Sequence, residues 1–331
     1  MGENKHNSPQ EKVKKLLNGD RRTAARLISS VENQSGEAAD LMKFVYPHTG
    51  KAMIIGITGA GGSGKSSLIN HLIERFRHQD KTVGVLAVDP SSPFSGGALL
   101  GDRIRFQKHS TDSGVYIRSM GSRGYLGGLA RATTDVVRIM EAMGNEVIII
   151  ETLGVGQDEI DIIHIAQTCL LILTPGMGDD IQAMKAGIME ISDLIVLNKA
   201  DLDGADVALR TLEATLHFSS PKEEGAWSPR VIPTVAVAAR SGEIQGIDDL
   251  VAAILKHQTY LRDNQSLDEI HAKRIEQELS LIFKDEVEKF VFAGLKGTGK
   301  KRQYIDAIIS GRNDPYSVVH EVLKTYLPNR E

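Results

Sequence analysis

Short apolar runs alternate with longer mixed segments through much of the middle of the chain. Six such runs, each four to seven residues long, lie at 53–57, 83–88, 147–150, 169–173, 194–197 and 231–237. Runs of this kind are typical of strands in a parallel sheet that helices cover on both faces. The pattern therefore predicts an α/β fold, with a mostly parallel sheet flanked by helices. Because Pro233 lacks a backbone N–H, we expect pairing of the last strand to begin after it.

The two ends of the chain show helical periodicity instead. Apolar residues recur at helical spacing over about 9–46, with a break near Gly19. From about residue 257 the pattern is a long amphipathic helix, and Pro315 opens one last short helix. We predict an N-terminal helical segment, a nucleotide-binding domain and a C-terminal helical arm, at 1–48, 49–256 and 257–331. The apolar stripe of the arm must pack on this domain or on another subunit.

A complete G-x-x-x-x-G-K-S motif, the P-loop, occupies residues 59–66 between the first apolar run and a helix-like segment. Backbone N–H groups of such a loop, together with the following helix N-terminus, form a cradle for phosphates. Lys65 should reach the β- and γ-phosphates, and the Ser66 hydroxyl should ligate Mg²⁺. The sequence thus predicts a P-loop nucleoside triphosphatase. The residues expected to bind the phosphates are Gly61, Gly62, Ser63, Gly64, Lys65, Ser66 and Ser67.

Composition narrows the class of protein further. A formal net charge of −4 argues against broad nucleic-acid binding, which favours a basic surface. A single cysteine, Cys169, excludes an internal disulfide framework and a multi-cysteine metal site. The chain has no apolar stretch of the ~18 residues that a membrane span needs, and its first residues are polar. We therefore expect a cytoplasmic protein without a membrane partner.

A second motif indicates which base is bound. Asn198-Lys199-Ala200-Asp201 follows the fifth apolar run and matches N-K-x-D. The Asp201 carboxylate can accept hydrogen bonds from both the N1–H and the exocyclic amine of guanine. Adenine offers neither donor there, so the site would reject it. We expect Asn198, Lys199 and Asp201 to bind guanine, with the Ala239 N–H near the guanine oxygen.

Carboxylates at other strand ends are candidates for the Mg²⁺ environment. Glu151 closes the third run and Asp89 the second, and Asp102 is either a third such carboxylate or a helix cap. The Gly154 N–H should sense the γ-phosphate. Gln157 could orient the attacking water, although it does not directly follow that glycine. We expect Lys65, Glu151 and Gln157 to be the catalytic set.

Several separated segments agree with one family. They are 88–92, 97–102, 126–130, 151–157 and the 198–201 motif. With these motifs the chain closely resembles the MeaB/ArgK-type P-loop GTPases, bacterial relatives of the human methylmalonic aciduria type A protein. The resemblance runs from about residue 10 to the Asp314-Pro315-Tyr316 tail.

This resemblance implies a GTPase chaperone that gates adenosylcobalamin loading and protects a B12-dependent acyl-CoA mutase of the methylmalonyl-CoA mutase type. It implies GTP/GDP and Mg²⁺ as cofactors, and a homodimer in which the C-terminal arm makes the contact. By motif, Ser66, Asp89, Asp102 and Glu151 resemble the Mg²⁺ environment. A loop at 178–185, which residue chemistry alone leaves unassigned, resembles the family's third switch. Its matching positions are Asp179, Gln182 and Lys185.

Two other functions fit the same nucleotide site. One is a small-molecule kinase of the amino-acid transport type, which would pass the γ-phosphoryl group to an acceptor. The other is a metal-insertion GTPase for nickel enzymes, which usually needs clustered cysteine and histidine ligands. One cysteine and ten dispersed histidines argue against it.

Overall fold

The computed structural model describes most of the chain. The described residues are 8–33, 35–89, 105–121, 128–152, 165–176, 192–219, 226–237, 243–264, 266–295 and 299–326. Backbone contacts divide the chain into two compact units, Met1–Ile270 and His271–Glu331. The proposed division at residue 48 into a helical segment and a nucleotide-binding domain remains a prediction.

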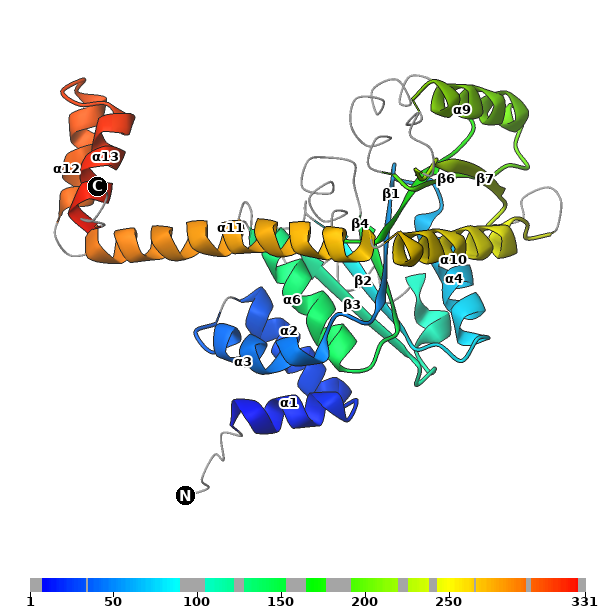
Figure 1. The fold of residues 1–331 in the computed structure, drawn as a ribbon, viewed down its shortest axis with the longest axis horizontal. Helices are drawn as coiled ribbons and strands as arrows, with labels where there is room; N and C mark the ends of the chain where they lie inside the picture. The colour runs from blue at the N-terminus through cyan, green and yellow to red at the C-terminus, as the bar shows by residue number, and fades with distance from the viewer. Residues whose placement is uncertain are drawn as a thin grey trace. The chain divides into compact units, whose positions relative to one another are not determined.

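A seven-stranded sheet forms the centre of the first unit (Figure 1). Its strand order is β3-β2-β4-β1-β5-β6-β7, and every neighbouring pair is parallel. The strands are β1 (Met53–Gly59), β2 (Val83–Asp89), β3 (Val115–Gly121), β4 (Val147–Thr152), β5 (Thr168–Leu173), β6 (Leu194–Asn198) and β7 (Arg230–Thr234). The α/β architecture predicted from the apolar runs is confirmed.

The first difference from the prediction is the edge strand β3, which no apolar run indicated. Its sequence places Arg118 and Ser119 in the middle of the strand. Arg118 lies over the N-terminal helices, where its guanidinium donates to the nearly buried carboxylate of Glu32 at 2.7 Å. An edge strand of this kind carries polar residues because only part of its surface faces the apolar core.

The second difference concerns Pro233. Strand β7 pairs with β6 from Arg230 onward, and Pro233 lies opposite Leu197 within the paired stretch. The expectation that pairing begins after the proline was therefore wrong. Val235, two residues later, exchanges hydrogen bonds with Gln245 on the side away from β6. The backbone nitrogen of Pro233 also faces away from β6. The N–H that proline lacks would therefore not have bonded β6.

Helices cover both faces of the sheet. On one face, α4 (Lys65–Arg77) and α10 (Ile247–Asp263) pack on side chains such as Ile55 and Ile57. The other face carries α6 (Gly128–Ala142) and α9 (Ala205–Ser219). The alternation of side chains along β1 explains this division. Ile55 and Ile57 point to the face that α4 and α10 cover, and Ile54 points to the face that α6 covers.

The predicted N-terminal helices are present, and they pack on the same face of the sheet as α6. They are α1 (Pro9–Leu17), α2 (Arg21–Glu32) and α3 (Ala38–Val45), followed by a short 3-10 turn η1 (Tyr46–His48). Ser8 and Asp20 cap the first two helices by accepting backbone N–H bonds. The apolar faces of these helices bury Leu16, Ile28 and Leu41 against α6 and the sheet.

The second unit is helical. Helix α11 (Ser266–Leu295) begins in the first unit and continues through the second, which also holds α12 (Lys300–Ile309) and α13 (Pro315–Tyr326). Leu295, Val318 and Val322 form a small core there. Pro315 occupies the first position of α13, as predicted. Among the described residues, no helix combines the length and the apolar character needed to cross a membrane.

Candidate functional site

The loop between β1 and α4 has a backbone that requires glycine at two positions. Gly59 has φ +144°, and a Cβ there would lie 2.3 Å from the Ile172 carbonyl oxygen. Gly64 has φ +93°, and its Cβ would lie 2.2 Å from Nδ2 of Asn198. Because other residues rarely adopt these angles and the space is filled, the glycines of the motif allow strand, loop and helix to meet this closely.

Helix α4 begins at the loop and provides a binding site for an anion. Lys65, Ser66 and Ser67 are its first three residues. Their backbone N–H groups have no carbonyl partner within the helix, and the positive end of the helix dipole lies at the same place. Gly62, which also has positive φ, turns the loop just before this helix start. The local structure is that of a phosphate-binding cradle.

Lys65 lies largely buried beneath the loop. Its ammonium group donates hydrogen bonds to the Gly59 carbonyl at 2.5 Å and to the Ala60 carbonyl at 3.0 Å. Burial lowers the pKa of Lys65, the Glu151 carboxylate opposes this shift, and the Arg105 guanidinium adds to it. The cation is thus held inside the cradle, where a phosphate would be attracted to it.

The Ser66 hydroxyl and the Glu151 carboxylate meet beside the cradle. Ser66 Oγ donates to Oε1 of Glu151 at 2.8 Å, and Glu151 is only 1% exposed. A hydroxyl and a carboxylate are hard oxygen donors of the type that Mg²⁺ takes, and Mg²⁺ usually completes its shell with water and phosphate oxygens. The pair therefore fits a Mg²⁺ ion that shares its remaining ligands with a nucleotide. Within the described ranges, no three histidine, cysteine or acidic side chains cluster as a metal site of their own.

Asn198 connects the phosphate loop to the neighbouring strands. Its amide donates to the Ser63 carbonyl at 2.8 Å, and its Oδ1 accepts from the Thr234 hydroxyl and the Ala236 N–H, both at 3.2 Å. Sequence reasoning did not identify Thr234, which lies fully buried in β7. The only signal for it was one hydroxyl-bearing residue inside an apolar run. Asn198 therefore holds the phosphate loop in a fixed position relative to the end of β7.

Asp201 is the residue in the guanine motif whose environment is incomplete. Both carboxylate oxygens are buried, and neither has a hydrogen-bond partner among the residues that the structure describes. Lys199 holds the turn with φ +59°, and the Ala200 N–H bonds the Thr234 carbonyl. A buried carboxylate with two open acceptors matches a ligand with two adjacent N–H donors. Guanine presents that pair of donors.

The structure brings together the predicted residues of the phosphate loop, Glu151, Asn198 and Asp201. Asp89 is the last residue of β2, and the preceding residue, Val88, lies opposite Thr152 of β4, which places the Asp89 backbone at the same edge. The remaining predicted residues lie outside the described part of the chain. They are Asp102, Gly154, Gln157, Asp179, Gln182, Lys185 and Ala239.

The sequence model of the family described as "Methylmalonyl Co-A mutase-associated GTPase MeaB" matches residues 24–296. A Pyrococcus abyssi protein named as a GTPase is 46% identical over 315 residues, which are 95% of each chain. The GTPase ArgK of Escherichia coli is 31% identical over 93% of this chain and 92% of its own. The solved structure of a LAO/AO transport system kinase is 25% identical, with a TM-score of 0.68 over 96% of this chain and 97% of that one.

Proposed function

The chain belongs to the MeaB family of methylmalonyl-CoA mutase-associated GTPases, and from this premise we propose that its GTPase activity serves a B12-dependent acyl-CoA mutase. In this proposal the protein acts in the cytoplasm as a chaperone-like switch. It gates adenosylcobalamin loading and protects a mutase of the methylmalonyl-CoA type. The observation that carries the proposal is the family match over 24–296, in a chain whose nucleotide site is complete where described.

GTP hydrolysis here relies on binding and charge placement by the chain's own residues. In the proposed reaction, water attacks the γ-phosphorus, the bond to the β-γ bridging oxygen breaks, and GDP, phosphate and a proton are released. Lys65 exchanges its two carbonyl partners for phosphate oxygens and stabilises their charge. Asp201 supports the choice of guanine, because its two open acceptors would pair with N1–H and the exocyclic amine.

Ser66 and Glu151 would hold Mg²⁺, with Asp89 and Asp102 as further proposed members of its environment. When bound, the ion would neutralise part of the phosphate charge. Ser66 and Glu151 would give up their mutual hydrogen bond and offer both oxygens to the ion. Gln157, as the residue that orients water, completes the proposed catalytic set with Lys65 and Glu151. The Gly154 N–H is the proposed sensor of the γ-phosphate.

The mutase connection is tested with a purified adenosylcobalamin-dependent methylmalonyl-CoA mutase. We expect this protein to bind the mutase, to slow its inactivation during turnover, and to make adenosylcobalamin loading depend on GTP hydrolysis. Loading is followed by absorbance, with GTP compared against a non-hydrolysable analogue. The proposed third switch, Asp179, Gln182 and Lys185, should be needed for this dependence while GTP affinity is retained. Absence of both binding and protection would reject the chaperone role.

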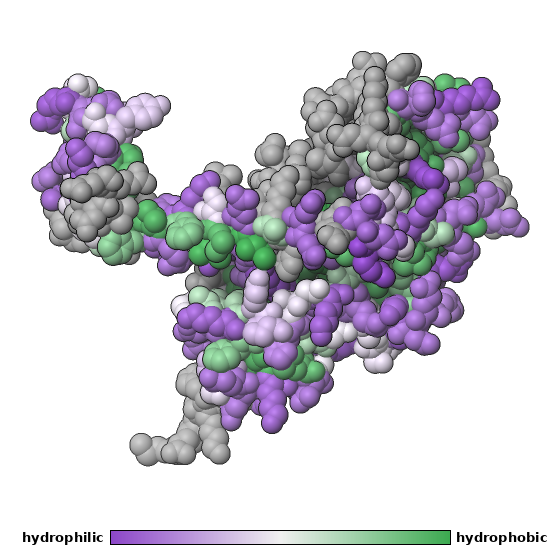
Figure 2. All heavy atoms as spheres, in the orientation of Figure 1, coloured by the Kyte–Doolittle hydropathy of each residue, from purple (hydrophilic) through white to green (hydrophobic). Residues whose placement is uncertain are grey.

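A homodimer through the C-terminal arm is part of the proposal. Helix α11 carries a row of exposed apolar side chains at helical spacing, Leu279, Phe283, Val287 and Phe290. Figure 2 shows hydrophobic residues gathered along this helix. Phe283 is 68% exposed, which is unusual for a large aromatic residue in a row of this kind. A second copy of the same helix would cover the row.

One observation favours a second candidate function, a small-molecule kinase. It is the likeness to the solved structure named as a LAO/AO transport system kinase. GTP labelled at the γ-phosphate and incubated with candidate acceptors, amino acids among them, separates the two activities. Label found only in free phosphate would reject the kinase, and label on an acceptor would support it.

A further inference from the structure

A pocket of about 640 Å³ opens at the end of the sheet opposite the nucleotide site. Met53 and Val147, the first residues of β1 and β4, lie in its wall, whereas Gly59 and Glu151 lie near the other ends of these strands. At about 3.3 Å per residue, the pocket and the phosphate cradle are about 20 Å apart. The volume is in the range of small-molecule sites, and a ligand here would not touch GTP.

The acidic groups of the pocket are already engaged. Oε1 of Glu141 accepts the backbone N–H groups of Lys51 and Ala52, the latter at 2.7 Å. Glu146 accepts from Nζ of Lys81 at 2.6 Å and from the Thr82 N–H. These contacts engage both oxygens of Glu146 and one oxygen of Glu141. The negative charge of both residues is therefore partly offset from within the protein.

The carbonyl end of α6 at the pocket is also capped. Asn145 donates from its side-chain amide to the Met140 carbonyl at 2.6 Å, and its backbone N–H bonds the same oxygen at 3.2 Å. These two hydrogen bonds partly neutralise the negative C-terminal end of α6 where it borders the pocket.

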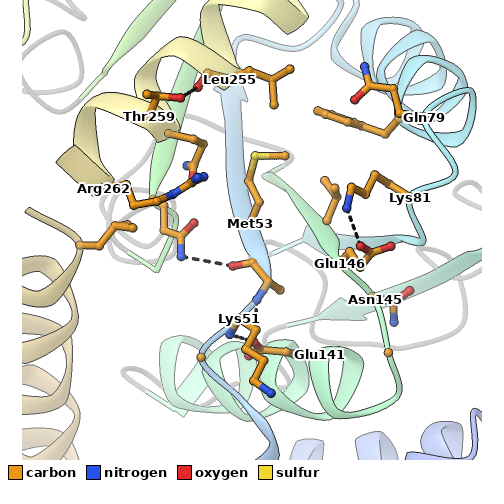
Figure 3. A pocket seen from close by; sticks show the side chains of 18 of the residues that line it. Lys51, Met53, Gln79, Lys81, Glu141, Asn145, Glu146, Leu255, Thr259 and Arg262 are labelled. Carbon is orange, nitrogen blue, oxygen red and sulfur yellow. Dashed lines mark hydrogen bonds and ion pairs between the residues drawn. The ribbon is translucent and has the colours of Figure 1, made fainter. Parts of the chain in front are cut away.

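Two cationic groups have no such engagement. The guanidinium of Arg262 and the ammonium of Lys51 have neither a hydrogen bond nor an ion pair within the described ranges. In Figure 3, Arg262 extends from α10 on one side of the pocket, with Met53 between it and the Lys81–Glu146 pair on the other. A guanidinium exposed in a concave site is suited to bind carboxylate or phosphate through two parallel hydrogen bonds.

Part of the remaining wall is apolar and part is polar. Met53, Phe76, Val147, Leu255 and Leu267 form the apolar part, beside polar side chains such as Gln79, Gln167 and Gln258. A ligand that satisfies both parts needs an anionic head and an apolar body. We propose that this pocket binds a small amphipathic anion, an organic carboxylate or phosphate whose head pairs with Arg262 and whose apolar body covers Met53.

Binding of octanoate and octyl phosphate to the full-length protein tests the proposal, with octanol and octylammonium as uncharged and cationic probes of the same length. The chain has nine methionines, and Met53 lines the pocket, so methyl-labelled methionine gives a local signal. We expect saturable shifts of the Met53 methyl resonance, assigned with Met53→Leu, for the two anions. The other two probes should bind at least about tenfold more weakly, and GDP should not change the titration. The tighter of the two anions identifies the head group.

Arg262→Gln should weaken anion binding by about tenfold, the loss expected for one charge-assisted pair. Arg210→Gln on α9, an exposed arginine outside the pocket, is the matched control and should bind as the parent does. Leu255→Trp should block the apolar part and abolish the Met53 shift. All three variants should retain GTP hydrolysis, which separates failure here from failure of the proposed function. Equal anion binding by the parent and Arg262→Gln, or no shift at Met53, would overturn the proposal.

Discussion

Asp201 and Asn198 of the guanine motif differ in whether their side-chain polar atoms have hydrogen-bond partners among the described residues. Asp201 is informative because both of its oxygens are buried without a partner among the described residues. Asn198 is informative for the opposite reason, since its side-chain amide donates to the Ser63 carbonyl and accepts from the Thr234 hydroxyl of β7. In the proposed function, Asp201 reads the base, whereas Asn198 positions the phosphate loop against β7. Substitutions at the two positions should therefore have different consequences.

Asp201→Asn should change the base that is bound. An amide in this position donates one hydrogen bond and accepts one, which suits the carbonyl and the N1–H of xanthine but leaves the guanine amine facing a donor. We expect GTP affinity to fall by about 100-fold or more and XTP to become the preferred substrate. Competition binding with GTP, XTP and ATP measures the preference. Tighter binding of ATP than of XTP by the variant would contradict this role.

Gly64→Ala should destabilise the cradle. The added Cβ would need φ +93° and would press on the Asn198 amide, which could then no longer bond Ser63. The backbone angle alone costs about 1–2 kcal/mol of unfolding free energy, and GTP binding should be lost with it. Gly61→Ala is the control for stability, because nothing lies within 4 Å of its Cβ. Urea denaturation compares the three proteins, and equal midpoints would show that this glycine is not required.

At the scale of elements, a buried polar cluster joins α10 to the start of β5 and β6. His257 Nε2 lies 3.5 Å from Oδ1 of Asp193, and its Nδ1 lies 2.9 Å from the Thr168 hydroxyl. The indole of Trp227 packs against His257 and donates to the Asp193 carbonyl. Burial raises the pKa of Asp193 to about 6 and lowers the pKa of His257 to about 4. The two shifts have opposite effects on stability.

Asp193 binds more protons in the folded than in the unfolded state between about pH 4 and 6, so its contribution to stability falls as pH rises through 6. His257 binds fewer protons when folded between about pH 4 and 6.5, so its contribution falls as pH decreases. Asp193→Asn should therefore make the protein lose stability more steeply than the parent on acidification from 6.5 to 4. His257→Gln should show the opposite trend. Unfolding free energies from urea titrations at several pH values test this, and profiles parallel to the parent's would contradict it.

At the scale of the whole molecule, the two units differ in how their apolar side chains are used. The first unit buries a large apolar cluster on each face of the sheet. The described core of the second unit contains only a few apolar side chains, among them Leu295, Val318 and Val322. The second unit leaves Leu279, Phe283 and Val287 of α11 exposed. Apolar surface of this kind is stabilised when another surface covers it. The homodimer proposal belongs at this scale.

Phe283→Glu should dissociate the proposed dimer. A carboxylate in the centre of the apolar row would be buried without a partner on association, which costs several kcal/mol. We expect a shift from dimer to monomer in sedimentation at micromolar concentration, with GTP affinity unchanged. Lys289→Glu, an exposed position that does not line the hollow formed by Phe283, Val287 and Val291, should leave the dimer intact. A parent protein that sediments as a monomer would reject the arrangement.

The sequence by itself determined the order and type of most elements. Apolar runs such as 194–197 gave strands because burial on both faces requires continuous apolar residues. The phosphate loop was equally readable, since its glycines and Lys65 are neighbours in the chain and their geometry is local. Strand β3 was not, because an edge strand that contacts helices through Arg118 carries no continuous apolar signal. Pro233 was misjudged because only the sheet order shows that its strand is an edge.

Only the tertiary structure decided which distant residues meet. Glu151 and Ser66 are 85 positions apart, and their hydrogen bond exists because β4 and β1 are neighbours in the sheet. Three further features depend on segments far apart in the sequence. They are the open acceptors of Asp201, the bridge through Asn198 and Thr234, and the Arg262 charge, which has no ion pair among the described residues, in the pocket beside Met53. Local patterns encode secondary structure and contiguous motifs. Burial and hydrogen-bond satisfaction are properties of the packed chain, so they became visible only after folding brought these residues together.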